Sequence, residues 1–267
     1  MDETRFQLIR VGAFTLSFGL MFAVQNLAPY RRAMRPMAGS WRQNIPLAVI
    51  NSILMRLVCG ACLCTVARDA EARGVGFFRI VEAPAWLAVA GTVLVLDFTL
   101  WVWHLANHRS RWLWRFHRVH HSDRDFDIST SMRFHAGELV QGLPLKLAVV
   151  AGLGAPLIGI LIFEVGFGLF NLFVHGNIRM PVRWEKRLTS ILILPSSHRR
   201  HHSVSPREHN RNFGTILSLW DRSFGTWAGG SSADAVTTGL SDLMPRGRLT
   251  LWPCLALPFE RRAAREG

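Results

Sequence analysis

The sequence predicts an all-α fold, in which an integral membrane helical bundle of three spans plus a helical hairpin carries a helical cap on its cytoplasmic side. Three observations predict this fold. Long apolar stretches recur along the 267 residues, one still longer apolar region is interrupted by glycine and proline, and alternating strand patterns are sparse. Because no internal repeat or separable second domain is visible, we expect residues 1–267 to form a single integral membrane domain.

The predicted spans are apolar stretches long enough to cross a hydrocarbon core, which needs about 20 residues. They are residues 8–29, 46–67 and 84–103. The first stretch is followed by Arg31 and Arg32 without a small-residue cleavage site, so it is expected to be retained and not removed as a signal peptide.

A fourth apolar region, residues 139–175, is longer than one span requires. Gly152, Gly154 and Pro156 interrupt it near its middle. Because glycine and proline end helices, this region is expected to form a helical hairpin that either spans the bilayer or dips into it.

The charges of the connections predict the orientation, because positively charged short loops stay in the cytoplasm. Four arginines and no acidic residue lie between the first two spans, namely Arg31, Arg32, Arg35 and Arg42. From residue 108 onward, 21 Lys and Arg face 12 Asp and Glu. We therefore expect the N-terminus outside and the region after the third span in the cytoplasm, against anionic lipid head groups. A C-terminus without an endoplasmic-reticulum retrieval signal favours a bacterial inner membrane.

The basic charge does not predict nucleic-acid binding, because the basic residues flank apolar spans and no nucleic-acid-binding motif is visible. Four tryptophans near the end of the third span are expected to form an interfacial belt, namely Trp101, Trp103, Trp112 and Trp114. Cys59 and Cys62 form a CxxC within the second span, but no second pair completes a tetrahedral metal set, so we interpret them as packing residues.

Histidine is the most informative residue type in this chain. The sequence has 11 histidines, none before residue 104. Eight of them fall in three clusters, which are His104 and His108 in WHLANH, His117, His120 and His121 in HRVHH, and His198, His201 and His202 in HRRHH. Residues three and four apart share one face of a helix, so each cluster can direct two or three imidazoles to one point. A purely structural role is common for a single pair of histidines, but not for three such clusters.

The number of clustered histidines favours two metal ions over one. Imidazole binds iron, zinc and copper in its neutral form. A tetrahedral zinc site uses four ligands, or three and a water molecule, whereas two six-coordinate ions with open positions use eight to ten.

The order HxxxH, HxxHH and HxxHH beside hydrophobic spans resembles the fatty acid hydroxylase superfamily, also called the sterol desaturase family. Further matching features are Asp97 seven residues before His104, Arg133-Phe134-His135 followed by Glu138, His175-Gly176-Asn177, Asn212-Phe213-Gly214, Trp220-Asp221 and Phe224-Gly225-Thr226. The resemblance covers about residues 85–228 and does not identify a substrate.

The resemblance implies nine metal ligands, which are His104, His108, His117, His120, His121, His175, His198, His201 and His202. Some members of the family have one more histidine a helical turn before the equivalent of His175, where this chain has Asn171. His135 is a possible tenth ligand, although its Arg-x-His context equally favours a structural role. We interpret His209, in the polar run PREHNR, as a solvated loop residue.

Three polar residues are expected to support the ligands without binding metal, namely Asp97, Asn177 and Asp221. Asp97 lies in an apolar run, where a carboxylate is costly unless it is paired. Because Asp97 shares a helical face with His104, it is expected to hold that imidazole in one tautomer; the alternative is an ion pair with an arginine of a neighbouring helix. Glu164 is expected to form a cap or an ion pair within the hairpin.

The resemblance implies a membrane oxygenase with two non-haem iron ions that uses O₂ to hydroxylate a lipid. The two electrons needed per turnover imply a separate donor, either a reductase, a ferredoxin or a cytochrome b5 type protein, because the chain has neither an iron–sulfur thiolate set nor a dinucleotide-binding fingerprint. Desaturation on the same site is the first alternative. A histidine-rich membrane metal transporter is the alternative from another class, although its polar residues would be expected within the spans.

Overall fold

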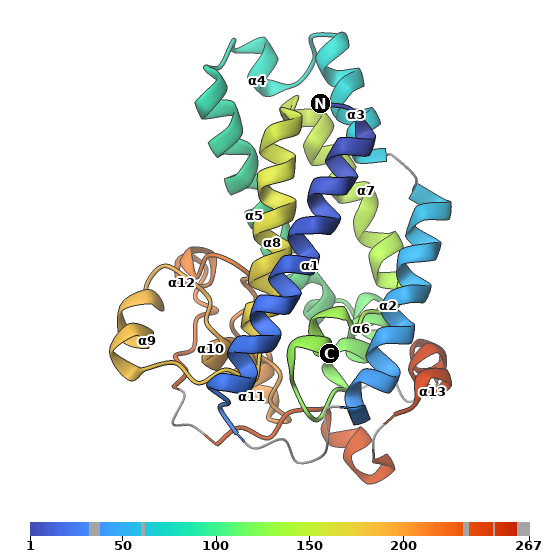
Figure 1. Cartoon of the computed structure of the whole chain (residues 1–267), viewed down its shortest axis with the longest axis vertical. Helices are drawn as coiled ribbons and strands as arrows, with labels where there is room; N and C mark the ends of the chain where they lie inside the picture. The colour runs from blue at the N-terminus through green and yellow to red at the C-terminus, as the bar shows by residue number, and fades with distance from the viewer. Residues whose placement is uncertain (32–37, 60–61, 232–234, 248, 261–267) are drawn as a thin grey trace.

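Long helices form one end of the molecule, and short helices and loops form the other (Figure 1). The computed structural model describes residues 1–31, 38–59, 62–231, 235–247 and 249–260. Within these residues the chain contains helices and three isolated β-bridges, and no β-strand. The predicted all-α class is confirmed.

Four of the long helices are apolar and long enough to cross a membrane. They are α1 (Glu3–Leu27), α5 (Ala85–Arg109), α7 (Ala136–Leu153) and α8 (Leu157–His175). The first and third predicted spans and the hairpin are therefore confirmed as helices. The third continues past its predicted end at residue 103, and the extension places His104 and His108 on the last turns of α5.

The second predicted span, residues 46–67, is not tested as a single helix, because it includes residues outside the described part of the chain. α2 (Ala38–Cys59) and α3 (Cys62–Ala72) share this stretch, and residues 60–61 lie outside the described part of the chain. α2 is not among the described helices that are long and apolar enough to span. Amides on its face bind the cap. Asn44 donates hydrogen bonds to the Asp123 carboxylate and the Ser129 hydroxyl, and Asn51 donates one to the carbonyl of Phe134.

The turn between α7 and α8 lies against the connection that follows α3. α7 ends at Gly154, whose φ of +61° is left-handed and favours glycine. Gly76 approaches this turn so closely that a Cβ atom there would lie 2.2 Å from the Gly154 nitrogen. This contact fixes the end of the hairpin that is far from the cap. The short helix α4 (Phe77–Ile80) follows Gly76 and leads into α5.

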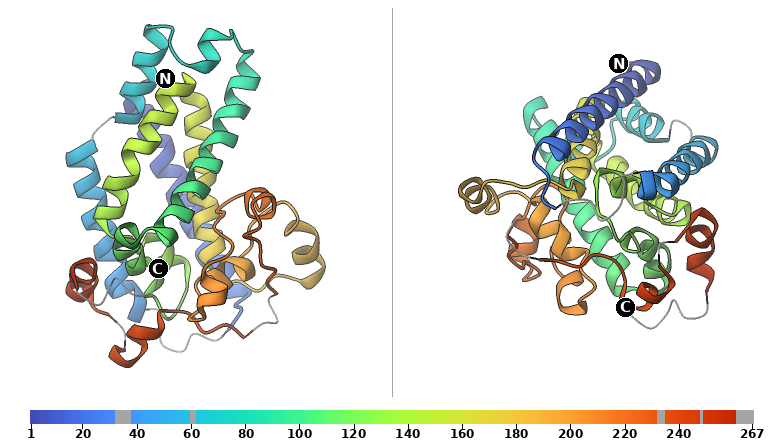
Figure 2. Two further views of the ribbon diagram at one scale, coloured as in Figure 1. Left: turned by 180° about the vertical axis from the view of Figure 1, so that it is seen from behind. Right: turned by 60° about the horizontal axis from the view of Figure 1, so that its bottom comes forward.

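The cap gathers the remaining helices below the bundle (Figure 2). They are α6 (Arg111–His121), η1 (Ile128–Met132), α9 (Val182–Leu188), α10 (Pro195–His201), α11 (Pro206–His209), α12 (Leu219–Ser223), η2 (Ser241–Arg246), α13 (Leu251–Ala256) and η3 (Leu257–Phe259). α5 and α8 both end in the cap, so two apolar helices lead directly into it.

The predicted tryptophan belt is wrong for two of its four members. Trp101 and Trp114 are 4% and 1% exposed, and only Trp112, at 59%, is open to the surroundings as an anchor would be. Trp101 is buried because its indole N–H donates to the Asp221 carboxylate at 3.1 Å. Trp114 is buried because it packs against the imidazoles of His108 and His121.

The cysteines that the structure describes are free and buried, namely Cys64 and Cys254. Neither belongs to a group of residues placed to hold a metal. The side chains of Cys59 and Cys62 lie outside the described part.

An ion triad joins three helices of the bundle. The Glu164 carboxylate of α8 accepts hydrogen bonds from the Lys146 ammonium of α7 and, at 3.3 Å, from the Arg10 guanidinium of α1. The Glu164 side chain is 10% exposed. The predicted ion pair within the hairpin is confirmed, and it extends to α1. Lysine and arginine near an apolar core are costly unless paired, so this carboxylate stabilises the packing of all three helices.

Replacement of Glu164 by glutamine should destabilise the bundle strongly, because Lys146 and Arg10 would be left near the apolar core without a counter-charge. Breaking a buried ion pair from one side costs about 3–5 kcal/mol. The control is Glu71→Gln, which removes an ion pair with Arg79 whose acidic side chain is 60% exposed and is expected to cost about 0–1 kcal/mol. Thermal unfolding of both variants in detergent checks this, and equal unfolding midpoints would contradict it.

Candidate metal centre

Four separate helices bring histidines to the junction between bundle and cap. α5 supplies His104 and His108, α6 supplies His117, His120 and His121, α8 supplies His175, and α10 with its C-terminal residue supplies His198, His201 and His202. In α5, α6 and α10 the spacing of three or four residues directs the imidazoles to the same side of the helix. The predicted clusters therefore converge, although they lie far apart in the sequence.

The nine histidines form two groups. The five-histidine group contains His104, His108, His117, His121 and His201, and the four-histidine group contains His120, His175, His198 and His202. Within each group one ring nitrogen per residue lies within 4.8 Å of the others. The two groups touch, because the rings of His121 and His202 stack with centroids 4.3 Å apart and planes at 14°.

Several ring nitrogens point at one another. The Nε2 atom of His175 lies 3.0 Å from the Nε2 atoms of both His120 and His198, and the Nε2 atoms of His117 and His121 lie 3.2 Å apart. Adjacent nitrogens on a six-coordinate ion with metal–nitrogen distances of about 2.1 Å would lie about 3.0 Å apart. The donor set thus fits a divalent transition metal in each group.

Buried nitrogens without protein partners support the same conclusion. Both ring nitrogens of His108 and of His202 are buried and make no hydrogen bond to the described residues. The Nε2 atoms of His104 and His201 are likewise buried and unpaired. Leaving buried polar atoms unsatisfied is costly, so these atoms are expected to bind a cation.

Backbone carbonyls fix the tautomers of three of these histidines. His104, His201 and His175 donate from Nδ1 to the carbonyl oxygens of Phe213, Arg211 and Asn171, each at 2.7 Å. Because a carbonyl only accepts, the proton lies on Nδ1 and the Nε2 lone pair is free to bind a metal.

A carboxylate fixes a fourth histidine. His117 donates from Nδ1 to Glu138 Oε1 at 2.9 Å, and both side chains are at most 5% exposed. A carboxylate bonded to the outer nitrogen of a ligand imidazole orients the ring and strengthens it as a metal donor. Glu138 belongs to one of the motifs of the sequence, but the motif does not predict this contact with His117.

Asp97 does not hold His104, so the predicted role is wrong. Its Oδ2 atom accepts a hydrogen bond from the indole of Trp220 at 2.9 Å, while the Phe213 carbonyl occupies the outer nitrogen of His104. The alternative ion pair with an arginine is not seen in the described part of the chain either. Asp97 instead attaches the segment that carries Phe213 to α5.

Asp221 supports the candidate ligand His104 indirectly, through the backbone of Phe213. Its carboxylate accepts hydrogen bonds from the backbone N–H groups of Phe213 and Gly214, at 2.9 and 2.8 Å, from the Thr226 hydroxyl and from the Trp101 indole. These four bonds hold the Phe213 carbonyl that orients His104.

The side chain of Asn177 bonds to the backbone of Arg31 and not to a candidate metal ligand, so its predicted supporting role is wrong. Its amide oxygen accepts from the backbone N–H of Arg31 at 3.2 Å, and its amide nitrogen donates to the Arg31 carbonyl at 2.8 Å. Asn177 therefore attaches the end of α1 to the chain that follows His175.

The possible tenth ligand, His135, lies outside both groups. It caps α7, where its Nδ1 atom accepts from the Gly137 N–H at 3.0 Å, and its Nε2 atom contacts the Leu255 carbonyl. Asn171 does not replace it, because its amide donates to the Ser131 carbonyl at 3.0 Å. Among the residues described, the two groups therefore contain nine histidines, and neither His135 nor Asn171 adds to them.

His209 is buried, not solvated. It is 4% exposed, and its ring stacks on Trp114 with centroids 5.7 Å apart and planes at 13°. The polar letters around it predicted a loop, but the short helix α11 turns the histidine inward.

Burial favours the neutral form of the candidate ligands in the cap. Removal from water lowers the pKa of five histidines well below the usual range, and neighbouring imidazoles lower it further; these are His120, His121, His198, His201 and His202. Because only the neutral ring binds a metal, this shift favours the ligand form near neutral pH.

Comparison with known proteins gives matches over the region that holds this centre. The chain is 30% identical over 202 residues to the ornithine lipid hydroxylase OlsE of Rhizobium tropici, which covers 76% of this chain and 59% of that protein. It is 31% identical over 172 residues to an alkylglycerol monooxygenase of Danio rerio, covering 62% and 34%. A cholesterol 25-hydroxylase-like protein of Danio rerio is 29% identical over 157 residues, covering 55% and 59%.

The chain thus spans less than two thirds of the length of each of these relatives. No solved structure matches it. The family model of the fatty acid hydroxylases matches residues 89–226, a range that includes all nine histidines of the two groups. Because this match covers more than half of the sequence, the chain belongs to the fatty acid hydroxylase family.

Proposed function

We propose that the chain is a membrane-bound non-haem di-iron oxygenase that uses O₂ and two external electrons to hydroxylate a lipid. The observation that carries this proposal is the pair of touching histidine groups, with five and four members, in which buried nitrogens converge without protein partners. Iron at both groups would supply the activation of O₂ and the attack on an unactivated C–H bond.

The composition of the ligand set supports iron with open positions. Five and four imidazoles leave each six-coordinate ion with at least one place for a ligand from outside the protein. Neither group contains a cysteine or a carboxylate among the described residues, so neutral donors would leave most of the metal charge uncompensated.

The surroundings of the four-histidine group suit an apolar substrate. The ring of Phe134 stacks on His120 with centroids 4.4 Å apart, and the ring of Phe126 lies 4.9 Å from that of His202. α5 and α8, which are both apolar enough to span a membrane, end at ligands. A lipid chain entering from the bilayer would therefore meet apolar walls that exclude water from the reacting carbon.

The chain's own residues hold the ligands in place and do not themselves react. Glu138 and the three backbone carbonyls keep the outer nitrogens protonated, so the inner nitrogens are already oriented before a metal binds. Asp97, Trp220 and Asp221 keep the Phe213 carbonyl in position.

Hydroxylation is favoured over desaturation because the relatives are named hydroxylases and monooxygenases, of an ornithine lipid, an alkylglycerol and cholesterol. A metal transporter is disfavoured, because the histidines form two compact groups at the junction between bundle and cap and not a series along the spans. We also propose a cytoplasmic catalytic side, a bacterial inner membrane, and a separate electron donor such as a reductase, a ferredoxin or a cytochrome b5 type protein.

Glu138→Gln should weaken metal binding, because an amide orients and polarises His117 less well than a carboxylate. Loss of such a partner typically costs about 10- to 100-fold in metal affinity. Titration of the purified full chain with Fe²⁺ against a chromophoric chelator measures this change. The control is Glu260→Gln, which removes an ion pair with Arg246 at the edge of the cap. Equal affinities of both variants and the unchanged chain would refute the role of Glu138.

Lipid mass spectrometry of cells with and without the chain tests the reaction. The proposal predicts a lipid species heavier by one oxygen atom, absent from cells that express His202→Ala at the same level. A species lighter by two hydrogen atoms would establish desaturation in place of hydroxylation. An unchanged lipid profile, with the protein present in the membrane fraction and an electron donor supplied, would contradict both reactions.

A further inference from the structure

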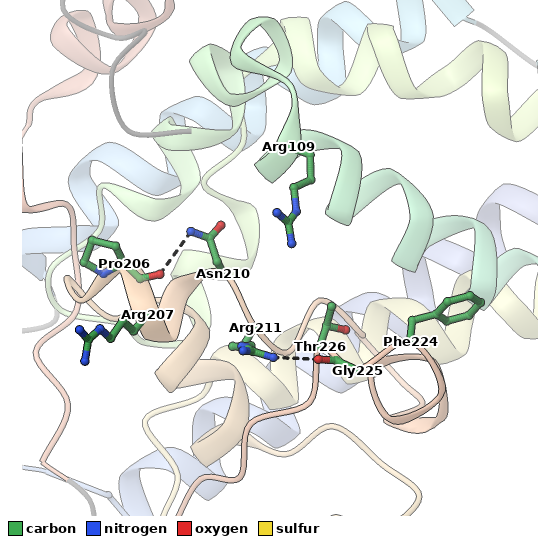
Figure 3. A pocket seen from close by; sticks show the side chains of 8 residues that line it. All are labelled: Arg109, Pro206, Arg207, Asn210, Arg211, Phe224, Gly225 and Thr226. Carbon is green, nitrogen blue, oxygen red and sulfur yellow. Dashed lines mark hydrogen bonds between the residues drawn. The ribbon is translucent and has the colours of Figure 1, made fainter.

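A cavity of about 440 Å³ opens where α5 ends in the cap, outside the histidine groups (Figure 3). α5 contributes Arg109 to its wall, α11 and the residues after it contribute Arg207, Asn210 and Arg211, and the turn after α12 contributes Phe224 and Thr226. The guanidinium of Arg109 extends from the end of α5 toward Asn210 and Arg211. None of the nine histidines lines this cavity, although the backbone of Arg211 and the hydroxyl of Thr226 also support the histidine groups.

The cavity is cationic and lacks a counter-charge. Three arginines and no carboxylate line it. Arg109 has no hydrogen bond or ion pair with the residues described, and Arg211 donates to a neutral partner, the Gly225 carbonyl, at 2.8 Å. The acidic residue nearest in sequence, Glu208, pairs with Arg200. Like charges held together without a carboxylate favour a bound anion.

The cavity also has an apolar end. Phe224 is 57% exposed, and its ring stacks on those of Trp101 and Phe98, with centroids 4.7 and 5.9 Å apart. These two residues precede Arg109 on α5 by about 12–16 Å of helix rise. The cavity therefore has a cationic end at the last residue of an apolar helix and an aromatic end farther along the same helix.

This arrangement matches the two parts of a phospholipid. α5 is long and apolar enough to span, so its last residue, Arg109, lies at the depth of the head groups. A guanidinium binds phosphate through two parallel hydrogen bonds, which a carboxylate-free cavity leaves available. We propose that Arg109 and Arg211 bind the phosphate of a membrane phospholipid, with Phe224 against the start of its acyl chain. The proposal does not depend on which metal the histidines bind.

Native mass spectrometry of the full chain in mixed micelles tests the site. The probe is phosphatidylglycerol, and the readout is the amount retained per chain. Arg109→Gln/Arg211→Gln should lower retention about tenfold or more, since hydrogen bonds between charged groups are lost. The matched control, Arg183→Gln/Arg187→Gln, removes two exposed arginines that lie over Trp184 on α9 and should leave retention unchanged.

Three outcomes would overturn the proposal. The first is equal retention by the pocket variant and the control. The second is displacement of the lipid by inorganic phosphate at equimolar concentration, which would identify a free-phosphate site. The third is unchanged retention of phosphatidylglycerol together with loss of electron transfer from an acidic donor protein, which would identify a protein-docking surface.

Metal content is measured on the same samples, so failure of the proposed function shows separately as absence of iron from every sample. Circular dichroism checks that each variant folds. If the double variant unfolds, Arg109→Gln alone decides the question, because the Arg109 side chain forms no bond within the described structure.

Discussion

Nine imidazoles, eight of them buried, lie side by side at the junction between an apolar bundle and its cap, and their inner nitrogens face one another at distances as short as 3.0 Å. Lone pairs at this spacing repel unless a cation lies between them, and burial has already removed the water that would satisfy them. The rest of the structure depends on this constraint. The helices must meet at this point, and the outer nitrogens must be held so that the inner ones stay directed inward.

The residues around the histidines hold the outer ring nitrogens in two ways, directly and through an intermediate segment. Glu138 and the backbone carbonyls contact the ligand rings directly. Asp221 and Asp97 lie one step farther out, where they hold the segment that presents the Phe213 carbonyl. A carboxylate saturated with N–H and O–H donors is well suited to fix a loop, because each bond to it is charge-assisted.

Spacing within the sequence was enough to predict that the eight clustered histidines converge, because residues three and four apart share a helical face whatever the tertiary structure. His175 was expected only from the family resemblance. The spacing did not predict how the nine histidines divide into groups of five and four, since HxxHH in α6 contributes to both groups. The same limit explains the error at Asp97. Helical periodicity shows that Asp97 and His104 share a face, but it does not show that Trp220 and Phe213, from a distant segment, lie between them.

Other errors arose where composition and tertiary contacts disagree. The polar run around His209 predicted solvent, but the Trp114 ring covers that histidine. The apolar stretch 46–67 predicted a span, but α2, which contains much of it, bonds to the cap through Asn51 and is not among the described helices apolar enough to span. The role of Glu138 was also missed, because α7 brings it to His117 from 21 residues away in the sequence.

The proposed di-iron centre requires each histidine group to hold one iron ion. Metal analysis of the purified full chain, combined with Mössbauer spectroscopy after growth on ⁵⁷Fe, measures this. Two iron ions per chain are expected, with spectra of high-spin iron in a nitrogen environment and no haem absorption. A single zinc ion per chain, or a haem spectrum, would contradict the proposal.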